Sequence, residues 1–273
     1  GHFASMKRRT VGLLVGLLGV VCLGLVFAVV YPPTTTEPHG ATPQGERFTV
    51  GDTDAYSATG RIVVDGDVRL AFEGVVTDAG GWYQSVAQGG VTSEEYRPSQ
   101  GSPVYQRFVV TDRERAERLR EQISEDEDRT LHREDRNGDS VTFLVEQNAT
   151  GATEPVSGTA SVFVTSLFIA SYRKGGSDSS AVAVYEPQSG WYDEGMTYRI
   201  TDVSGAVVAD TETHAVRSAN VSWVVTEPAG TYAEYTLASV TDDEVTSQRI
   251  VYEYDTDDTA IERPAWVAET DWE

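Results

Sequence analysis

The sequence has few of the side chains from which most catalytic and metal sites are built. Its 273 residues include one cysteine and four histidines. Because Cys22 lies inside a long apolar segment, the rest of the chain has no disulfide framework. No two histidines have the spacing of metal ligands, and neither a nucleophile elbow nor a phosphate-binding glycine loop is present. We therefore expect no enzyme activity, no metal and no cofactor.

Basic side chains are also scarce, with 21 Lys and Arg against 43 Asp and Glu, and lysine occurs only at Lys7 and Lys174. Three basic residues precede the apolar segment, so the part after it carries a net charge of −25. This composition resembles that of haloarchaeal proteins. Salt of about 1 M shortens the Debye length to roughly 3 Å and screens the self-repulsion of such an acidic surface. The lack of a basic stripe argues against nucleic acid as a partner.

One long hydrophobic run is present near the start. Val11–Val30 is 20 residues without a charge, and three basic residues, 7–9, stand before it. A helix of that length spans about 30 Å, the thickness of a bilayer core. The charge bias predicts a single-pass cell-membrane protein with residues 1–9 in the cytoplasm, an anchor at 10–31 and the remainder outside. Residues 1–5 are set aside as a tag or a misassigned start.

A cleaved signal peptide is the alternative interpretation of this run, because Val26 and Ala28 loosely fit a small-x-small cleavage site. Cys22 is then either a packed membrane thiol or a lipidation site, although the residues before it make a poor lipobox. Four prolines and four threonines follow in Pro32–Gly45. This composition predicts an extended stalk at 32–47 and an extracellular domain at 48–270.

Strand-forming patterns dominate that domain. β-branched and aromatic runs bounded by Gly, Pro or Asp predict strands at Tyr56–Val64, Asp67–Val76, Val104–Thr111, Ala181–Tyr185, Met196–Val203, His214–Thr226, Thr231–Val240 and Thr246–Tyr254. Asp65-Gly66 predicts a two-residue hairpin turn, and Ser204-Gly205 predicts a further turn. The pattern indicates a long antiparallel meander.

Two segments depart from the alternation of strands. Thr111–Ser124 begins with a capping-box pattern, Thr111 to Glu114, and predicts a surface helix. Thr159–Tyr172 is apolar on nearly all sides of a helical wheel, so we expect a helix that is covered on more than one side. Because the segment is rich in β-branched residues, a buried strand is its alternative.

A family resemblance rests on the later part of the chain. Arg249–Tyr254, an acidic turn and Ile261–Trp266 resemble the ending of LolA/LppX-like lipoprotein carriers of archaea. Tyr185–Tyr192, followed by Tyr198–Ile200 and Val203–Gly205, is similar to their central hairpins. The resemblance implies a curved, unclosed half-barrel plugged by helices, whose concave apolar face receives acyl chains. This chain has an anchor in place of a lipobox cysteine, so a shuttling role does not follow.

The expected fold is therefore mainly β: one N-terminal transmembrane helix, then an antiparallel, curved half-barrel-like sheet with one or two inserted helices. Two functions stay open. The first is a domain that binds a lipid or another apolar ligand, and the second is a structural or protein-interaction domain with a filled core. An apolar cavity under the helix would favour the first. Its expected lining is Leu70, Phe72, Phe163, Leu167, Phe168, Trp223 and Tyr235.

Three smaller motifs are also present in the sequence. Asp135–Asp139, with Glu146, has part of the spacing of a calcium loop, but Gly138 stands at position 4 instead of 6. Asn137-Gly138 is also a strong hairpin signal, and we favour the hairpin. Asn148 and Asn220 begin Asn-x-Ser/Thr triplets and are possible glycosylation acceptors in an outside-facing domain.

Overall fold

The computed structural model describes residues 35–36, 46–150, 152–176, 181–193, 197–226, 245–257 and 259–272. The expected anchor at 10–31, most of the stalk, the strand at Thr231–Val240 and the pocket residue Tyr235 lie outside these residues. Within the described part of the chain, no helix has the length and hydrophobicity needed to cross a membrane.

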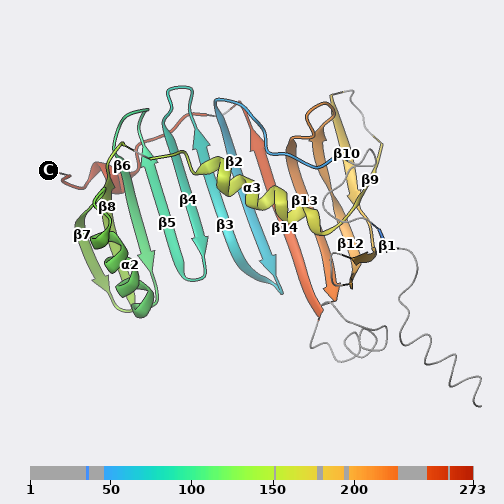
Figure 1. Ribbon diagram of the computed structural model, residues 1–273, viewed down its shortest axis with the longest axis horizontal. Helices are drawn as coiled ribbons and strands as arrows, with labels where there is room; N and C mark the ends of the chain where they lie inside the picture. Colours follow the sequence, from blue (N-terminus) through green and yellow to red (C-terminus); the bar gives the residue numbers. More distant parts are fainter. Residues whose placement is uncertain are drawn as a thin grey trace, which may run out of the picture.

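The described chain forms one large, open and curved sheet, as Figure 1 shows. Thirteen of its strands pair antiparallel: β2 (Tyr56–Val64), β3 (Asp67–Val76), β4 (Trp82–Gln88), β5 (Val91–Arg97), β6 (Val104–Val110), β7 (Arg129–Asn137), β8 (Ser140–Gln147), β9 (Tyr172–Lys174), β10 (Val182–Pro187), β11 (Gly190–Asp193), β12 (Thr197–Asp210), β13 (Val216–Thr226) and β14 (Val245–Asp255). The fourteenth strand, β1 (Thr35–Thr36), lies within the expected stalk and pairs parallel with β11.

The sheet consists of two meanders that meet in its middle. The strands from β2 to β6 follow one another outward, β8 pairs with β6, and β7 forms the edge beyond β8. The chain then returns to the opposite end of the sheet. From there β12, β13 and β14 lead back, and β14 pairs with β2. Helix α3 (Val156–Ser166) is the crossing segment and lies over β2, β3, β4 and β14. The topology therefore explains why the apolar helix interrupts the strands in the sequence.

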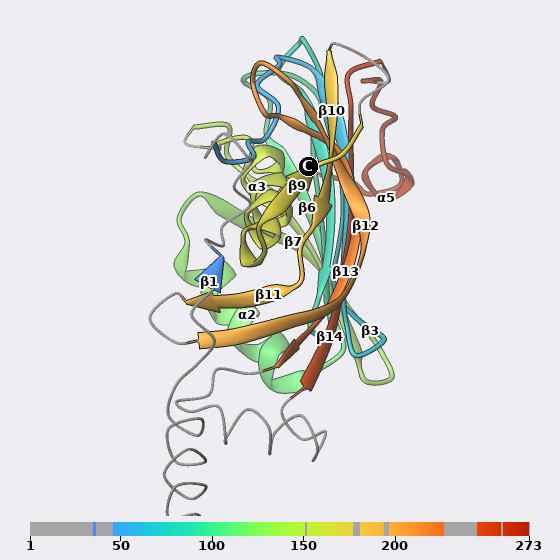
Figure 2. The same cartoon turned by 90° about the vertical axis from the view of Figure 1, so that its right-hand side faces the viewer.

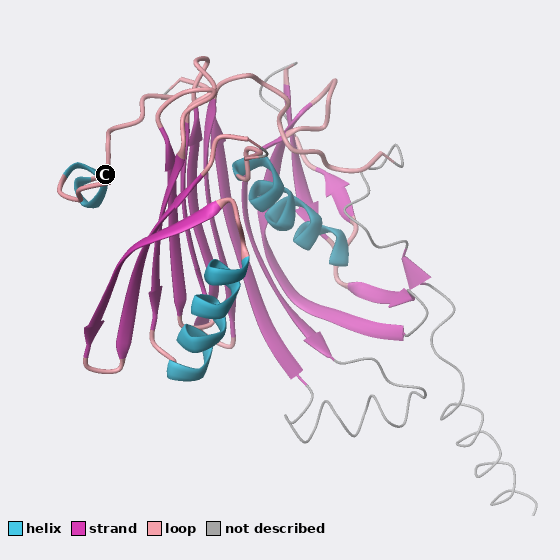
Figure 3. Cartoon of the chain, turned by 60° about the vertical axis from the view of Figure 1, so that its left-hand side comes forward, coloured by secondary structure: helices cyan, strands magenta, loops and turns pink. Residues whose placement is uncertain are grey.

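The helices lie on both sides of the sheet. Seen edge-on in Figure 2, α3 and α2 (Arg113–Glu125) lie on the side toward which β11 and one end of β12 curve, and α5 (Ala265–Ala268) lies on the other. Figure 3 shows α2 and α3 as separate helices on this concave face. The expectation of a curved antiparallel sheet with few helices is confirmed.

Two hairpin predictions are confirmed. Asp65 and Gly66 both have positive φ, 52° and 84°, as the turn between β2 and β3 requires. The strands β7 and β8 meet at Asn137, which pairs with Ser140. Asp135 is paired with Thr142 on β8, and Glu146 lies four residues further along that strand. Four residues of a strand span roughly 14 Å. The hairpin, and not a calcium loop, is the structure of this segment.

The expected turn at Ser204-Gly205 is wrong. β12 continues through these residues with a register shift between Thr201 and Ser204. Gly205 has φ 88°, and an added Cβ would come within 1.9 Å of the Asn220 backbone oxygen on β13. Glycine is therefore required here for a close approach of two paired strands, and the irregularity of β12 is a bulge at residues 202–203, just before Gly205.

The two helices also differ from their expected forms. α2 has Asp112 as its N-cap, whose carboxylate accepts from the Arg115 backbone N–H at 2.8 Å, so the capping-box prediction is wrong. α3 and a 3-10 turn (Leu167–Ile169) replace the helix predicted at Thr159–Tyr172, and Tyr172 begins β9. Val162 is 47% exposed, so α3 is covered on one side and not on several.

Candidate functional site

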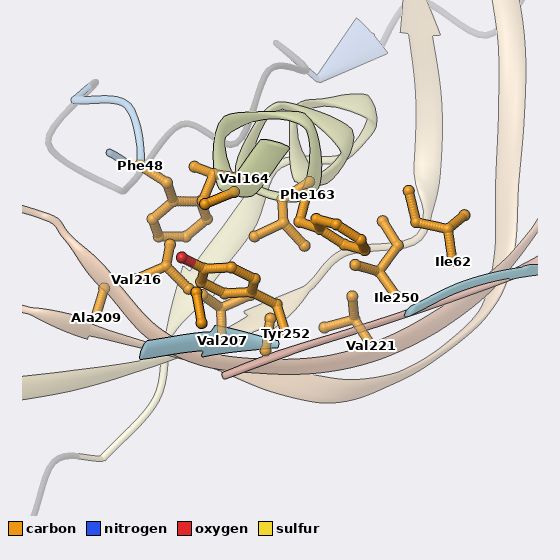
Figure 4. Packing of buried hydrophobic residues seen from close by; sticks show 14 of the residues in the cluster. Phe48, Ile62, Phe163, Val164, Val207, Ala209, Val216, Val221, Ile250 and Tyr252 are labelled. Atoms are coloured by element: carbon orange, nitrogen blue, oxygen red, sulfur yellow. The ribbon is translucent and has the colours of Figure 1, made fainter. Parts of the chain in front are cut away.

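The concave face beneath α3 is occupied by side chains of the chain itself. Phe163 is fully buried, and its ring stacks on Phe72 and Tyr252 with centroids 5.7 and 6.1 Å apart. Figure 4 shows Phe163 and Val164 pointing from the helix toward the side chains of the sheet. Aromatic pairs at these separations add to the stability that burial provides.

Two glycines let α3 lie directly on the sheet. A Cβ at Gly60 on β2 would come within 2.5 Å of the Phe163 ring, and one at Gly74 on β3 would come within 2.5 Å of Val156. Such distances are far below van der Waals contact, so any side chain at these positions would push the helix away. The helix and the sheet are therefore complementary in shape at the two points of closest approach.

Five of the seven expected pocket residues share one apolar cluster. These five are at most 8% exposed: Leu70, Phe72, Phe163, Leu167 and Trp223. Phe168 is only half-buried at the edge of this cluster, with the Arg47 guanidinium 5.7 Å from its ring centroid. The structure therefore brings the predicted residues together, but they pack against one another.

Several members of the same cluster were not predicted from the sequence. Phe48, placed at the start of the domain, is 2% exposed and contacts Tyr172 and Tyr185 edge-on at 5.0 and 5.4 Å. Tyr252 alternates with Ile250 on β14, and both are fully buried. The alternation of apolar and polar residues in Thr246–Tyr254 was the signal in the sequence that Ile250 and Tyr252 face the core.

A second, smaller apolar cluster lies under α2. Ala116 and Ile123, which face inward from the helix, are both 2% exposed. They pack with inward side chains of β6 and β8, namely Phe108, Val110, Val141, Phe143 and Val145. The expected surface helix is thus held by a narrow apolar stripe.

A polar band separates the two apolar clusters on the concave face. Gln84, Glu95 and Gln106 are paired in register across β4, β5 and β6, and both glutamines are at most 6% exposed. Gln106 donates to the Gln147 side chain at 3.2 Å. Burial raises the pKa of Glu95, an effect that the charge of Arg129 opposes. The concave face is therefore not one continuous apolar surface for an acyl chain.

Three cavities bordered by described residues have volumes of about 450, 450 and 290 Å³. The first is a depression on the convex face among small side chains such as Ala71, Ser85 and Ala87. The second lies near the start of α3, and the third lies beside Trp223. None of the three is lined by Phe163 or Leu167.

The remaining motifs lie apart from this face. His132 Nε2 is 3.3 Å from a Glu146 carboxylate oxygen, and His214 pairs with Glu46. Among the described residues, no group of three His, Cys, Asp or Glu side chains is placed to hold a metal ion. Asn148 is exposed after β8, whereas Asn220 is exposed within β13 and accepts from the Arg249 guanidinium at 3.1 and 3.2 Å.

Comparisons with family models, with curated proteins and with solved structures give no match to this chain. The function is therefore inferred from the geometry of the domain.

Proposed function

We propose that the chain is a membrane-anchored, extracellular structural or protein-interaction domain of the cell envelope, without catalytic activity. One observation carries this proposal: Phe163 fills the concave face directly above Gly60 and between Phe72 and Tyr252. A site prepared for a large apolar guest normally keeps an open apolar volume. Here the corresponding place is taken by the chain's own helix.

The lipid-binding function that the LolA/LppX-like resemblance implies is the second candidate. It is supported by the open, curved sheet and by a helix on its concave face. An acyl chain would enter this face only if α3 moved away and exposed Phe163, Val164 and Leu167. At about 1.5–3 kcal/mol for each large side chain, that exposure costs roughly 5–9 kcal/mol. This is comparable with the whole stability of many domains, so the geometry favours the interaction function.

The convex face offers the surface for a partner in this proposal. Around its depression, the outward residues of β2, β3, β4 and β14 combine small side chains with the charged rim of Arg61, Glu73 and Glu253. Small residues let a partner backbone approach the sheet closely, and rim charges select its orientation. This face is therefore the place at which contact with another envelope protein is to be sought.

Three measurements on the full-length chain test the proposal. Titration with a fluorescent fatty acid in molar salt should show no saturable binding, and native mass spectrometry should show no retained lipid. A photo-crosslinking residue at Ala87 should give a discrete protein adduct in native membranes. The same residue at Val162, exposed on α3, serves as the matched control. Saturable lipid binding, together with no adduct at Ala87, would replace this function by the lipid-binding one.

A further inference from the structure

The cavity near the start of α3 has an unusual floor. Its volume is about 450 Å³, and its most buried lining residues, which we call its floor, are Val76, Trp82 and Arg97. These three residues are paired in register across β3, β4 and β5, and each is at most 8% exposed. The floor therefore consists of an apolar wall beside two side chains that carry N–H donors.

Neither donor side chain has a partner for all of its N–H groups. Arg97 makes one hydrogen bond, from Nη1 to the Ala152 carbonyl oxygen at 3.2 Å, and its Nε–H has no partner. Within the part of the chain that the structure describes, no carboxylate forms an ion pair with Arg97. The Trp82 Nε1–H is also buried without a partner. Buried donors in folded proteins are nearly always paired, so two unpaired ones bordering one cavity indicate a missing acceptor.

The mouth of the cavity carries the opposite charge. Asp54 and Asp78 are exposed at the mouth, and Glu154 forms part of the wall. The Glu154 carboxylate accepts from the backbone N–H groups of Val156 and Ser157 at the start of α3. The cavity is thus net negative, which disfavours a simple anion, while the guanidinium on its floor disfavours a simple cation.

We propose that this cavity binds a small zwitterion. The carboxylate of the ligand accepts from Arg97 and Trp82, and its ammonium group faces Asp54 and Asp78. A guanidinium offers a carboxylate two parallel donors, which gives both orientation and affinity. Free amino acids and betaine-type compounds share this chemistry, and the cavity volume lies within the usual range for small ligands. The inference does not depend on the proposed function, because the cavity is separate from the filled face under Phe163.

The test is isothermal titration calorimetry of the full-length chain at molar potassium chloride, with glycine, glycine betaine, acetate and methylammonium as probes. We expect saturable binding of glycine, of glycine betaine or of both, at least about tenfold tighter than either single-charge probe. Comparing the two zwitterions shows whether the site takes a primary or a quaternary ammonium group. Acetate binding as tightly as the zwitterions, or no binding of any probe up to about 50 mM, would overturn the proposal.

Variants separate binding from folding. Trp82→Phe keeps an aromatic ring but removes the indole N–H together with part of the buried apolar surface, so zwitterion binding should weaken about tenfold, and the titration is done below the lowered melting temperature of this variant. Asp78→Asn, at an exposed position, should weaken glycine binding and strengthen acetate binding. Tyr83→Phe, on the opposite face of β4, is the matched control and should change neither glycine binding nor acetate binding. Zwitterion binding that is unchanged in both Trp82→Phe and Asp78→Asn would place the ligand elsewhere.

Discussion

The close approach of Phe163 to Gly60 allows a sharp test of the filled concave face. Phe163→Ala removes a fully buried, stacked ring and should lower the free energy of unfolding by about 3–5 kcal/mol. Gly60→Ala in the parent places a Cβ 2.5 Å from that ring and should cost about 1–3 kcal/mol through overpacking. Each change alone is therefore destabilising.

The double variant decides whether the two residues act through their contact. Once Phe163 is alanine, the new methyl group at position 60 has room. Replacing a strand glycine then stabilises the fold by about 0.5–1 kcal/mol. The coupling free energy between the two sites should thus be roughly 1.5–4 kcal/mol, in or just above the upper part of the range found for residues in direct contact.

Urea unfolding of the four proteins in molar salt measures this coupling. Gly158→Ala is the matched glycine control, because an added Cβ there meets nothing within 4 Å, and it should stabilise α3 by about 0.5–1 kcal/mol. Phe168→Ala, at a half-buried ring, should cost less than Phe163→Ala. Additive effects of Gly60→Ala and Phe163→Ala, within about 0.5 kcal/mol, would refute the packing described here.

Four further outcomes are expected. Asp112→Ala should lower the free energy of unfolding by about 1 kcal/mol in urea melts, because the Arg115 N–H loses its cap. Burial raises the pKa of Glu95, so the penalty of its charge appears as the pH rises through that raised pKa and is absent below the unfolded value. Glu95→Gln should therefore stabilise the protein at pH 7 and flatten this part of its pH–stability curve. The melting temperature should rise between about 0.1 and 3 M salt, and a flat profile would contradict the screening argument. Protein from native membranes should retain Met6–Val30 and resist carbonate extraction, whereas a mature N-terminus near Val29 in the medium would show cleavage.

Local features of the fold were predictable from the sequence. The hairpin at Asp65-Gly66 and the bounds of β2 and β3 follow from period-2 alternation and from residues that tolerate positive φ. The turn predicted at Ser204-Gly205 is wrong because a glycine with positive φ occurs both in turns and within paired strands, and Gly205 is paired with Val221 on β13. What distinguishes them is the partner strand, whose Asn220 backbone lies against Gly205 and is remote in sequence.

The arrangement of the elements in space was less predictable, because it also depends on residues that are remote in sequence. The helical wheel of α3 shows which residues are apolar, but Val162 is exposed because only one layer of sheet covers the helix. The unpaired donors of Trp82 and Arg97 leave no trace in sequence spacing, since strand register and not a motif brings them to one cavity. The cover of the helix and the position of the unpaired donors therefore depend on long-range strand pairing, which local sequence patterns do not reveal.

The seam between β14 and β2 has a consequence for the order in which the chain folds. Ile62 on β2 pairs with Ile250 on β14, which is the last of the described strands to be synthesised. One edge of β2 therefore stays unpaired until β14 has been made. At a synthesis rate of about 5–20 residues per second, roughly 190 residues correspond to about 10–40 s. During this time the edge of β2 is open to pairing with other chains. Productive folding of this domain is therefore a competition between completing the sheet and aggregation at its unfinished centre.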